Sequence, residues 1–133
     1  MSEAVTRNIR VSVETEYTPG RSNPAQSQWF FLYTIHLKNE GRETVQLMSR
    51  HWIITDAMGD VKEVRGPGVV GKQPVLEPGE TFEYTSGCEL TTPFGSMRGT
   101  YHMEKVTDKA DKKEHFDIQI PPFTLTEPYT TVH

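Results

Sequence analysis

The fold class is decided by one stretch of the sequence, Trp29-Phe30-Phe31-Leu32-Tyr33-Thr34-Ile35-His36-Leu37-Lys38. Every second residue from Trp29 to Leu37 is large and apolar, whereas the residues between them become polar towards the end of the stretch. Successive side chains of a β-strand point to opposite faces of its sheet, so this alternation favours a strand over a helix. We therefore expect a central strand with one face wholly in a core.

The same two-residue period recurs along the chain, whereas a sustained helical period does not. Turn residues separate the periodic segments, as in Asn39-Glu40-Gly41-Arg42 and Met58-Gly59-Asp60. The other expected strands cover residues 8–16, 61–65, 81–86, 97–106 and 116–120, together with two apolar runs at 45–48 and 52–54. Pro121-Pro122 is expected to end the last of them. About seven or eight strands predict an all-β fold, a fibronectin type III-like (immunoglobulin-like) β-sandwich.

The length of 133 residues suits a single domain that buries an ordinary core. We expect one domain over residues 1–133. Its ends, residues 1–7 and 124–133, lie outside the clearly periodic segments and are expected to be loosely ordered tails.

Charge and composition exclude several function classes. The formal net charge is −4 and the basic residues are scattered, which argues against direct binding to nucleic acid. Cys88 is the only cysteine, so an internal disulfide is excluded and a reducing compartment is favoured. No apolar run has the length of a membrane span or a signal peptide, so we expect a cytoplasmic protein without membrane insertion.

The stretch Gly66-Pro67-Gly68-Val69-Val70-Gly71-Lys72 matches two phosphate-binding patterns in its spacing. The dinucleotide pattern G-x-G-x-x-G needs a helix after the glycines, but Pro74, Pro78 and Gly79 make the following residues extended loop and turn. The P-loop pattern needs a Ser or Thr after the lysine, where this chain has Gln73. Neither nucleotide fold is therefore expected.

Two interpretations of this loop stay open. In the first, a nest of backbone amides holds a phosphate or pyrophosphate, with the charge of Lys72 added. The residues of this phosphate loop would be Gly66, Gly68, Val69, Val70, Gly71 and Lys72. In the second, which we favour because no helix dipole is available, the glycines adopt positive φ and Val69 and Val70 pack inward.

The turn Thr92-Pro93-Phe94-Gly95 is a candidate partner surface. Phe94 lies between Pro and Gly in a turn, where an aromatic side chain need not be buried. An exposed aromatic beside adaptable methionines suits a protein interface, since a few large side chains anchor such surfaces. The methionines and tyrosine that follow on alternate positions are better explained as core.

No metal, cofactor or catalytic residues are expected. His36, His51, His102 and His115 lie on four different predicted strands, without the close spacing of a zinc or cobalt site. Cys88 has no base near it in sequence, and a buried thiol is the commoner outcome. We therefore expect a protein that is not an enzyme.

Several runs of the chain together closely resemble one known family. They are Gly66 to Pro74, Leu76-Glu77-Pro78-Gly79-Glu80, Phe82-Glu83-Tyr84-Thr85-Ser86-Gly87, Thr92 to Met103, and Arg50-His51-Trp52-Ile53-Ile54-Thr55-Asp56. The chain resembles the bacterial ApaG family, also called CorD, over nearly its whole length. The resemblance implies a fibronectin type III-like sandwich and a regulatory association with divalent cations, namely cobalt resistance and magnesium efflux. It supplies no catalytic residues, and related eukaryotic domains look like partner-binding modules.

The combined prediction is a non-enzymatic binding module for another protein. Docking would use a sheet face or an exposed edge, with the glycine loop and the Thr92 to Gly99 turn forming one rim. A homodimer through a sheet edge is a further arrangement that such edges allow. The alternative function is binding of phosphate, pyrophosphate or a dinucleotide polyphosphate at the loop from Gly66 to Lys72. Family genes often neighbour one for a diadenosine tetraphosphate hydrolase, which also motivates this alternative.

Overall fold

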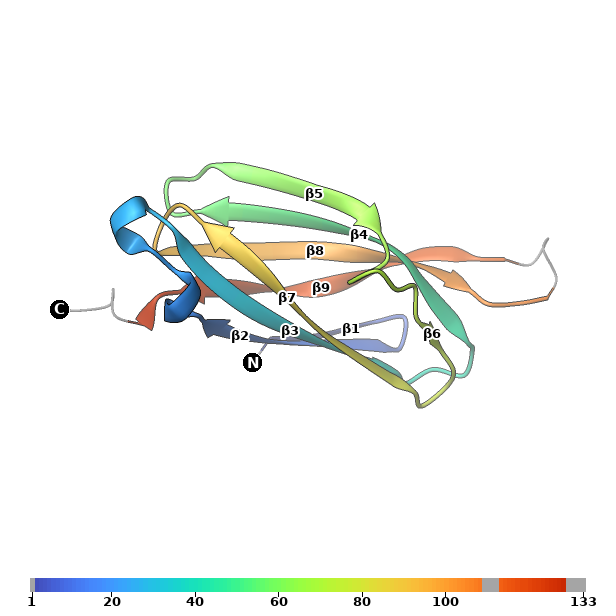
Figure 1. Cartoon of the computed structure of the whole chain (residues 1–133). Helices are drawn as coiled ribbons and strands as arrows, with labels where there is room; N and C mark the ends of the chain where they lie inside the picture. The colour runs from blue at the N-terminus through green and yellow to red at the C-terminus, as the bar shows by residue number, and fades with distance from the viewer. Residues whose placement is uncertain (1, 109–112, 129–133) are drawn as a thin grey trace.

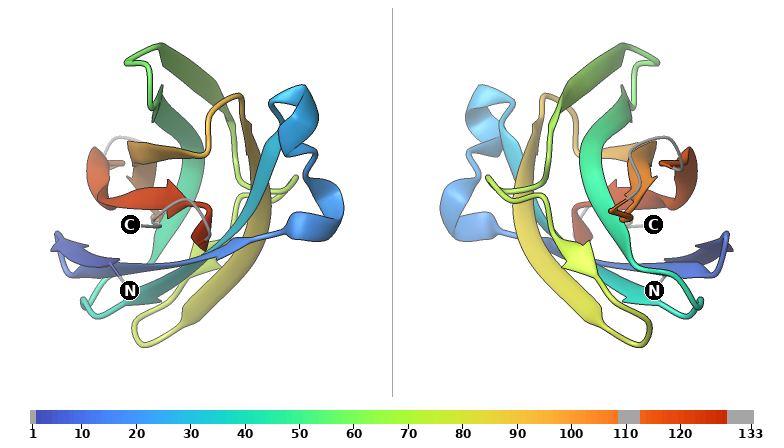
Figure 2. Two further views of the ribbon diagram at one scale, coloured as in Figure 1. Left: turned by 90° about the vertical axis from the view of Figure 1, so that its left-hand side faces the viewer. Right: turned by 90° about the vertical axis from the view of Figure 1, so that its right-hand side faces the viewer.

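The computed structural model describes residues 2–108 and 113–128. Its strands form two antiparallel sheets that face each other as the two layers of a sandwich (Figures 1 and 2). One sheet has the order β1-β2-β3-β7, and the other has the order β5-β4-β8-β9 with β6 also paired to β4. The elements are β1 (Ser2–Thr6), β2 (Ile9–Tyr17), η1 (Pro19–Arg21), η2 (Pro24–Gln26), β3 (Trp29–Asn39), β4 (Val45–Asp56), β5 (Val61–Pro67), β6 (Val75–Leu76), β7 (Thr81–Leu90), β8 (Phe94–Lys105) and β9 (His115–Thr126). The predicted all-β sandwich is confirmed.

Strand β3 has the central position that its alternating sequence predicts. It pairs with β2 on one side and with β7 on the other. Phe31, Tyr33, Ile35 and Leu37 all point into the core and are buried. Each such side chain contributes about 1.5–3 kcal/mol when it leaves water, so this one strand supplies a large part of the hydrophobic stabilisation.

Strand β4 contains both apolar runs, at 45–48 and 52–54, and a bulge lies between them. The register with β8 shifts between Leu47 and Ser49. Val45 and Leu47 are buried before the shift, and Trp52 is buried after it. An extra residue in a strand moves the following side chains to the other face, so inward positions change from odd to even numbers. This change of phase places Arg50 on the same face as Trp52.

Both ends of the chain differ from the expectation of loose tails. Residues 2–6 form β1, which pairs with β2 in register from Ser2 opposite Val13 to Thr6 opposite Ile9. Residues 124–126 belong to β9, which continues through Pro121-Pro122 instead of ending there. Residue 1 and residues 129–133 of the predicted tails lie outside the described residues.

Strand β9 accommodates its two prolines because they lie at an irregularity on an outer strand of the sheet. The pairing of β9 with β8 shifts between Met97 opposite Phe123 and Gly99 opposite Ile120, which places the prolines inside the irregular segment. Proline cannot donate to a ladder, and β-bulges and edge strands are where a sheet tolerates it.

One long side of the sandwich is sealed, because β1 and β2 contact β9 across the gap between the sheets. The Gln119 amide donates to the Thr6 hydroxyl oxygen at 3.1 Å. The Arg7 guanidinium pairs with Glu114 at 2.8 Å and lies over the ring of Phe116 at 4.5 Å from its centroid. We call this margin, formed by β1, β2 and β9, the closed side.

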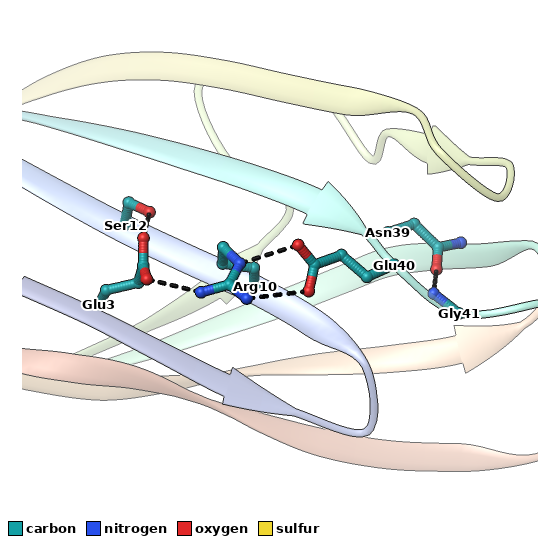
Figure 3. A network of polar contacts seen from close by, with 6 residues as sticks. All are labelled: Glu3, Arg10, Ser12, Asn39, Glu40 and Gly41. Carbon is teal, nitrogen blue, oxygen red and sulfur yellow. Dashed lines mark hydrogen bonds and ion pairs between the residues drawn. The ribbon is translucent and has the colours of Figure 1, made fainter.

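A polar network reinforces the outer surface of the closed side (Figure 3). Arg10 on β2 lies between two carboxylates, donating to Glu3 of β1 at 2.5 Å and to Glu40 after β3 at 2.8 Å. Glu3 also accepts from the Ser12 hydroxyl at 3.0 Å. The Asn39 side-chain oxygen accepts from the Gly41 amide at 2.9 Å, which closes the turn after β3.

Candidate functional site

The opposite long side of the sandwich is open, and we call it the open side. There β5 pairs only with β4 and β7 only with β3 among the described residues, so each presents an unpaired edge. Between these two strands lies a cleft of about 530 Å³ whose lining includes Tyr33, Arg50 and Trp52. A second hollow of about 370 Å³ shares Tyr33, Arg50, Trp52 and Ser86 with the first and extends beneath the glycine loop. The two form one cleft along the open side.

Arg50 carries the positive charge at the centre of this cleft. Its Nη1 donates to the carbonyl oxygens of Pro67 at 2.9 Å and Gly68 at 2.8 Å. The guanidinium lies against Gly66, where an added Cβ would be 3.0 Å from Nη2. Among the described residues, no carboxylate oxygen lies within ion-pair distance of Arg50. The cleft therefore contains a partly buried cation held by neutral groups.

Hydroxyl groups line the same hollow as this cation. The Tyr84 hydroxyl, from β7, hydrogen-bonds with that of Tyr101, from β8, at 2.5 Å across the sandwich. Burial raises the pKa of Tyr33, and Ser86 and the charge of Arg50 act in the opposite direction. Burial likewise raises the pKa of Tyr84 and Tyr101, and Arg50 again opposes the shift. These phenols are neutral donors at physiological pH.

The far end of the cleft has the opposite charge. Asp56, Asp60 and Glu89 line it together with Lys62. Asp56 also shapes the turn after β4, since its Oδ1 accepts from the amides of Met58 at 2.8 Å and Asp60 at 3.1 Å. The cleft is therefore polarised, with a cation below the glycine loop and an excess of carboxylates at the other end.

The glycine loop has most of its predicted donors committed to the fold. The Gly68 amide donates to the Met48 carbonyl at 2.9 Å. The amides of Val69 and Lys72 bond reciprocally to each other's carbonyls at 2.8 and 2.9 Å. Gly68 has φ +60°, and a Cβ there would lie 2.3 Å from the Lys72 carbonyl oxygen, so this position requires glycine.

The two valines of the loop differ from each other. Val69 is buried, as expected, whereas Val70 has φ +42° and is 53% exposed. The prediction that both pack inward is therefore right only for Val69. Positive φ is unfavourable for a β-branched residue. The tight turn that pairs Val69 with Lys72 imposes this φ on Val70 and so determines where its side chain points.

The turn Thr92-Pro93-Phe94-Gly95 combines a structural residue with an exposed one. The Thr92 side chain is buried, and its hydroxyl donates to the Phe94 carbonyl and accepts from the Ala57 amide. Phe94 is 50% exposed. Met58 and Val61, on and beside the neighbouring turn, are also exposed apolar residues.

The glycine loop and this turn do not form one rim. Asp56, at the end of β4, lies opposite Gly95, while Arg50 lies opposite Gly66. The two segments therefore lie at opposite ends of β5, as Figure 1 also shows. Strand β5 lies between them, so each segment lies at one end of the open side.

The four histidines of the described residues lie on β3, β4, β8 and β9, and two of them meet. His102 Nδ1 is 2.9 Å from Asp117, and His102 Nε2 is 3.1 Å from His115 Nδ1 with the rings stacked. His51 Nε2 is 2.7 Å from Glu63, on the same outer face of the sheet. In the described part of the chain, no group of three or more His, Cys, Asp or Glu is arranged to hold a metal ion.

Sequence reasoning missed Arg50, Tyr33, Tyr84 and Ser86 as site residues. They converge from three strands of two sheets, so no local motif joins them. The one available signal was Arg50 itself, two residues before the apolar Trp52 on an alternating strand. Its inward direction would have marked a charge inside the sandwich.

None of the helical segments in the described residues is long and apolar enough to cross a bilayer.

The surroundings of Cys88 determine whether its thiol can act as a nucleophile. The thiol is buried at the margin of the cleft, and burial raises its pKa to about 11. A thiol with so high a pKa carries little thiolate at neutral pH and is a poor nucleophile.

Comparison with known proteins gives a consistent result. The family model described as the ApaG domain matches residues 19–105. A protein ApaG of Beijerinckia indica subsp. indica is 52% identical over 130 residues, covering 98% of this chain and 96% of the relative. Another, of Bradyrhizobium sp. (strain ORS 278), is 53% identical over 128 residues, covering 96% of this chain and 95% of the relative.

Solved structures agree in fold. A crystal structure described as an ApaA protein from Bordetella pertussis superposes with TM-score 0.84 at 50% identity, covering 91% of this chain and 94% of that one. The C-terminal domain of wzt has TM-score 0.54 at 7% identity, covering 93% of this chain and 75% of that one, and shows a likeness of fold alone. The match of the family model and the identity with full-length relatives show that the chain belongs to the ApaG family.

Proposed function

We propose that this protein is a cytoplasmic, non-enzymatic binding module that holds a segment of a partner protein along its open side. The observation that carries the proposal is the cleft between β5 and β7, which combines an aromatic floor at Tyr33 and Trp52 with two unpaired strand edges. Extended segments bind such edges through main-chain hydrogen bonds, while pockets beside the edge select side chains.

Exposed apolar side chains at the end of the cleft support this choice. Val61 is 61% exposed and lines the cleft, and Phe94 and Met58 lie on the neighbouring turns. Large apolar side chains with a polar surround are typical anchors of protein interfaces. The neutral thiol of Cys88 and the neutral phenols also suit recognition better than nucleophilic chemistry.

The association with cobalt resistance and magnesium efflux, which the family resemblance implies, would act through that partner. The protein would then regulate cation handling without coordinating the cation itself. The alternative function, phosphate or dinucleotide polyphosphate binding by the glycine loop, has weaker support because the amides of Gly68, Val69 and Lys72 already have backbone acceptors.

Site-specific photocrosslinking in the native host tests the proposal with a matched pair of positions. Val61 on β5 and Val5 on β1 are both exposed valines, at 61% and 48%, on strands of the open and closed sides respectively. A benzophenone amino acid at Val61 should give a defined protein adduct that the same group at Val5 does not give.

The crosslinked protein is then identified by mass spectrometry, purified, and titrated by calorimetry against the wild-type protein. A saturable interaction supports the module. Equal adducts from both positions, or adducts only from Val5, would contradict docking on the open side, and an adduct with a second copy of this chain would replace the partner by a homodimer.

A further inference from the structure

We propose that the cleft contains an anion subsite, formed by Arg50 with the hydroxyls of Ser86 and Tyr84, that takes the carboxylate of an Asp or Glu in the partner segment. This inference rests on the proposed function, since it specifies what that partner presents. The subsite differs from the phosphate loop suggested by the sequence, because side chains on the inner face of the sandwich form it.

The charge of Arg50 is unbalanced within the described part of the chain. The bulge in β4 turns this residue towards the interior, in phase with the buried Trp52. Arg50 is partly buried, and a charge partly withdrawn from water is stabilised by a counter-charge. Among the described residues no carboxylate fulfils that role, so a ligand carboxylate would complete the site.

Arg50 also keeps N–H donors that the fold does not use. A guanidinium has five N–H donors, and the structure commits only those of Nη1, to the carbonyl oxygens of Pro67 and Gly68. No acceptor among the described residues takes the other three. Arginine binds a carboxylate most strongly through two parallel donors, which Nη2 and Nε can supply.

The glycine loop gains a specific role in this arrangement. Its carbonyls, not its amides, hold the guanidinium in place, and Gly66 leaves room for the flat group to lie against the strand. An anchored arginine loses little further side-chain entropy when a ligand binds. The loop therefore preorganises the subsite without itself binding the anion.

The hydroxyls supply the neutral part of the subsite. Tyr33, Tyr84, Ser86 and Arg50 all line the hollow beneath the loop. Tyr101 is fully buried, so its hydroxyl can donate to Tyr84 and leave the Tyr84 proton for a ligand. Charge-assisted hydrogen bonds from such donors are stronger than neutral ones.

Charge and shape favour a single carboxylate over a polyphosphate. One guanidinium matches one negative charge, and a phosphate chain extending along the cleft would approach Asp56, Asp60 and Glu89. An extended peptide can instead place a basic residue at that end. Gly66, beside Arg50, and Val61, at the acidic end of the cleft, are five residues apart on β5. The acidic and basic residues of the bound peptide should therefore be separated by roughly 17 Å, or about five residues of extended peptide.

Selection from a library of displayed random 12-residue peptides tests the subsite directly. Peptides selected on the wild-type protein should be enriched in Asp or Glu beside an apolar residue, with Lys or Arg about five residues away. The same selection on Arg50→Gln should lose the acidic residue. Arg65→Gln is the matched control, because Arg65 is an exposed arginine on β5 that pairs with Glu63 on the outer face.

A cycle of substitutions then measures the contact. By fluorescence polarisation, changing the selected Glu to Gln should weaken binding to the wild type about tenfold or more, and should have little effect on Arg50→Gln. Ser86→Ala, which leaves the loop carbonyls with Arg50, should weaken the acidic peptide several-fold. This second variant keeps the test decisive if Arg50→Gln loosens the loop.

Two results would overturn the subsite. Selected peptides that lack an acidic residue, or bind Arg50→Gln as well as the wild type, would leave the open side as a docking site but remove the carboxylate from it. Tighter, Arg50-dependent binding of inorganic pyrophosphate or diadenosine tetraphosphate would assign the cation to a phosphate ligand. Failure of the crosslinking at Val61 would instead contradict the proposed function itself.

Discussion

The two long sides of this sandwich differ in whether the outer strands of the sheets are covered. On the closed side, β1 and β2 cover β9, and paired charges such as Arg7 with Glu114 lie over the seam. On the open side, the margins of β5 and β7 remain unpaired and enclose a cleft with the partly buried Arg50. The closed side therefore contributes to stability, whereas the open side keeps unpaired edges and a cation without a carboxylate partner among the described residues, as the proposed docking requires.

Matched truncations of two isoleucines should separate the sides most strongly. Ile118 on β9 is fully buried, whereas Ile54 on β4 is partly buried and lines the open cleft. Ile118→Ala should lower the free energy of unfolding by about 2–5 kcal/mol, because the cavity left behind is enclosed. Ile54→Ala should cost clearly less, since the lost volume joins the existing cleft.

Urea unfolding monitored by circular dichroism measures both values. The comparison requires equal m-values, so that the unfolded states match. Equal losses for the two variants would mean that the open side is packed as tightly as the closed side, and the distinction would fail.

A regular strand could be predicted from the sequence, whereas the positions that depend on a bulge could not. Alternation in residues 29–38 was sufficient to place β3 in the core, because each inward residue lies two positions from the next on a regular strand. Arg50 could not be assigned in that way, since the bulge between Leu47 and Ser49 reverses the phase of β4 and is not marked by a Gly or Pro. The prediction that Pro121-Pro122 ends the last strand was wrong, because a bulge on an outer strand accommodates prolines that would end a regular strand.

The glycine loop shows why a motif alone did not define a site. Its spacing is that of phosphate-binding loops, but hydrogen bonding of Gly68, Val69 and Lys72 depends on the neighbouring strand and on the turn itself. Its contact with Arg50 joins residues 16 to 18 positions apart, so only the pairing of β5 with β4 reveals it.

Alkaline pH should destabilise the protein through buried acidic groups, most of which line the open cleft. Burial raises the pKa of the Cys88 thiol from 9.0 to about 11, and burial also raises the pKa of Tyr33, Tyr84 and Tyr101. The folded state therefore holds these protons more tightly than the unfolded chain does. Stability should be unaffected below about pH 8 and should fall as pH rises from 9 to 11, with Cys88 alone contributing about 3 kcal/mol.

Thermal unfolding at several pH values, with a reductant present, measures this slope. Cys88→Ala removes one titrating group, so its melting temperature should fall less steeply between pH 9 and 11 than that of the wild type. Parallel slopes for the two proteins would show that the thiol is not shielded as the structure indicates.

Replacing Arg50 by Met should have a much smaller effect on stability than on binding. The substitution removes the cost of holding a cation partly away from water, and it also removes two hydrogen bonds to the loop carbonyls. We expect these effects to offset each other to within about 1 kcal/mol in urea unfolding, while the acidic peptides lose affinity. A stability loss above about 2 kcal/mol would make Arg50 a structural support of the glycine loop.

The smallest effect is expected on the closed side, at Arg10. This guanidinium bonds to Glu3 and Glu40 at the surface, and those two carboxylates raise its pKa, with the hydrogen bond to Glu40 as the largest contribution. Arg10→Met should lower the melting temperature slightly at low salt, and the difference from wild type should shrink as salt screens the exposed pairs. Arg50→Met should show no such salt dependence in stability, because its lost partners are neutral carbonyls. The affinity for the acidic peptides should fall in Arg50→Met and should be unchanged in Arg10→Met. If Arg10→Met instead weakened the acidic peptides, the anion would bind on the network of Figure 3, and the functional distinction between the two sides would be lost.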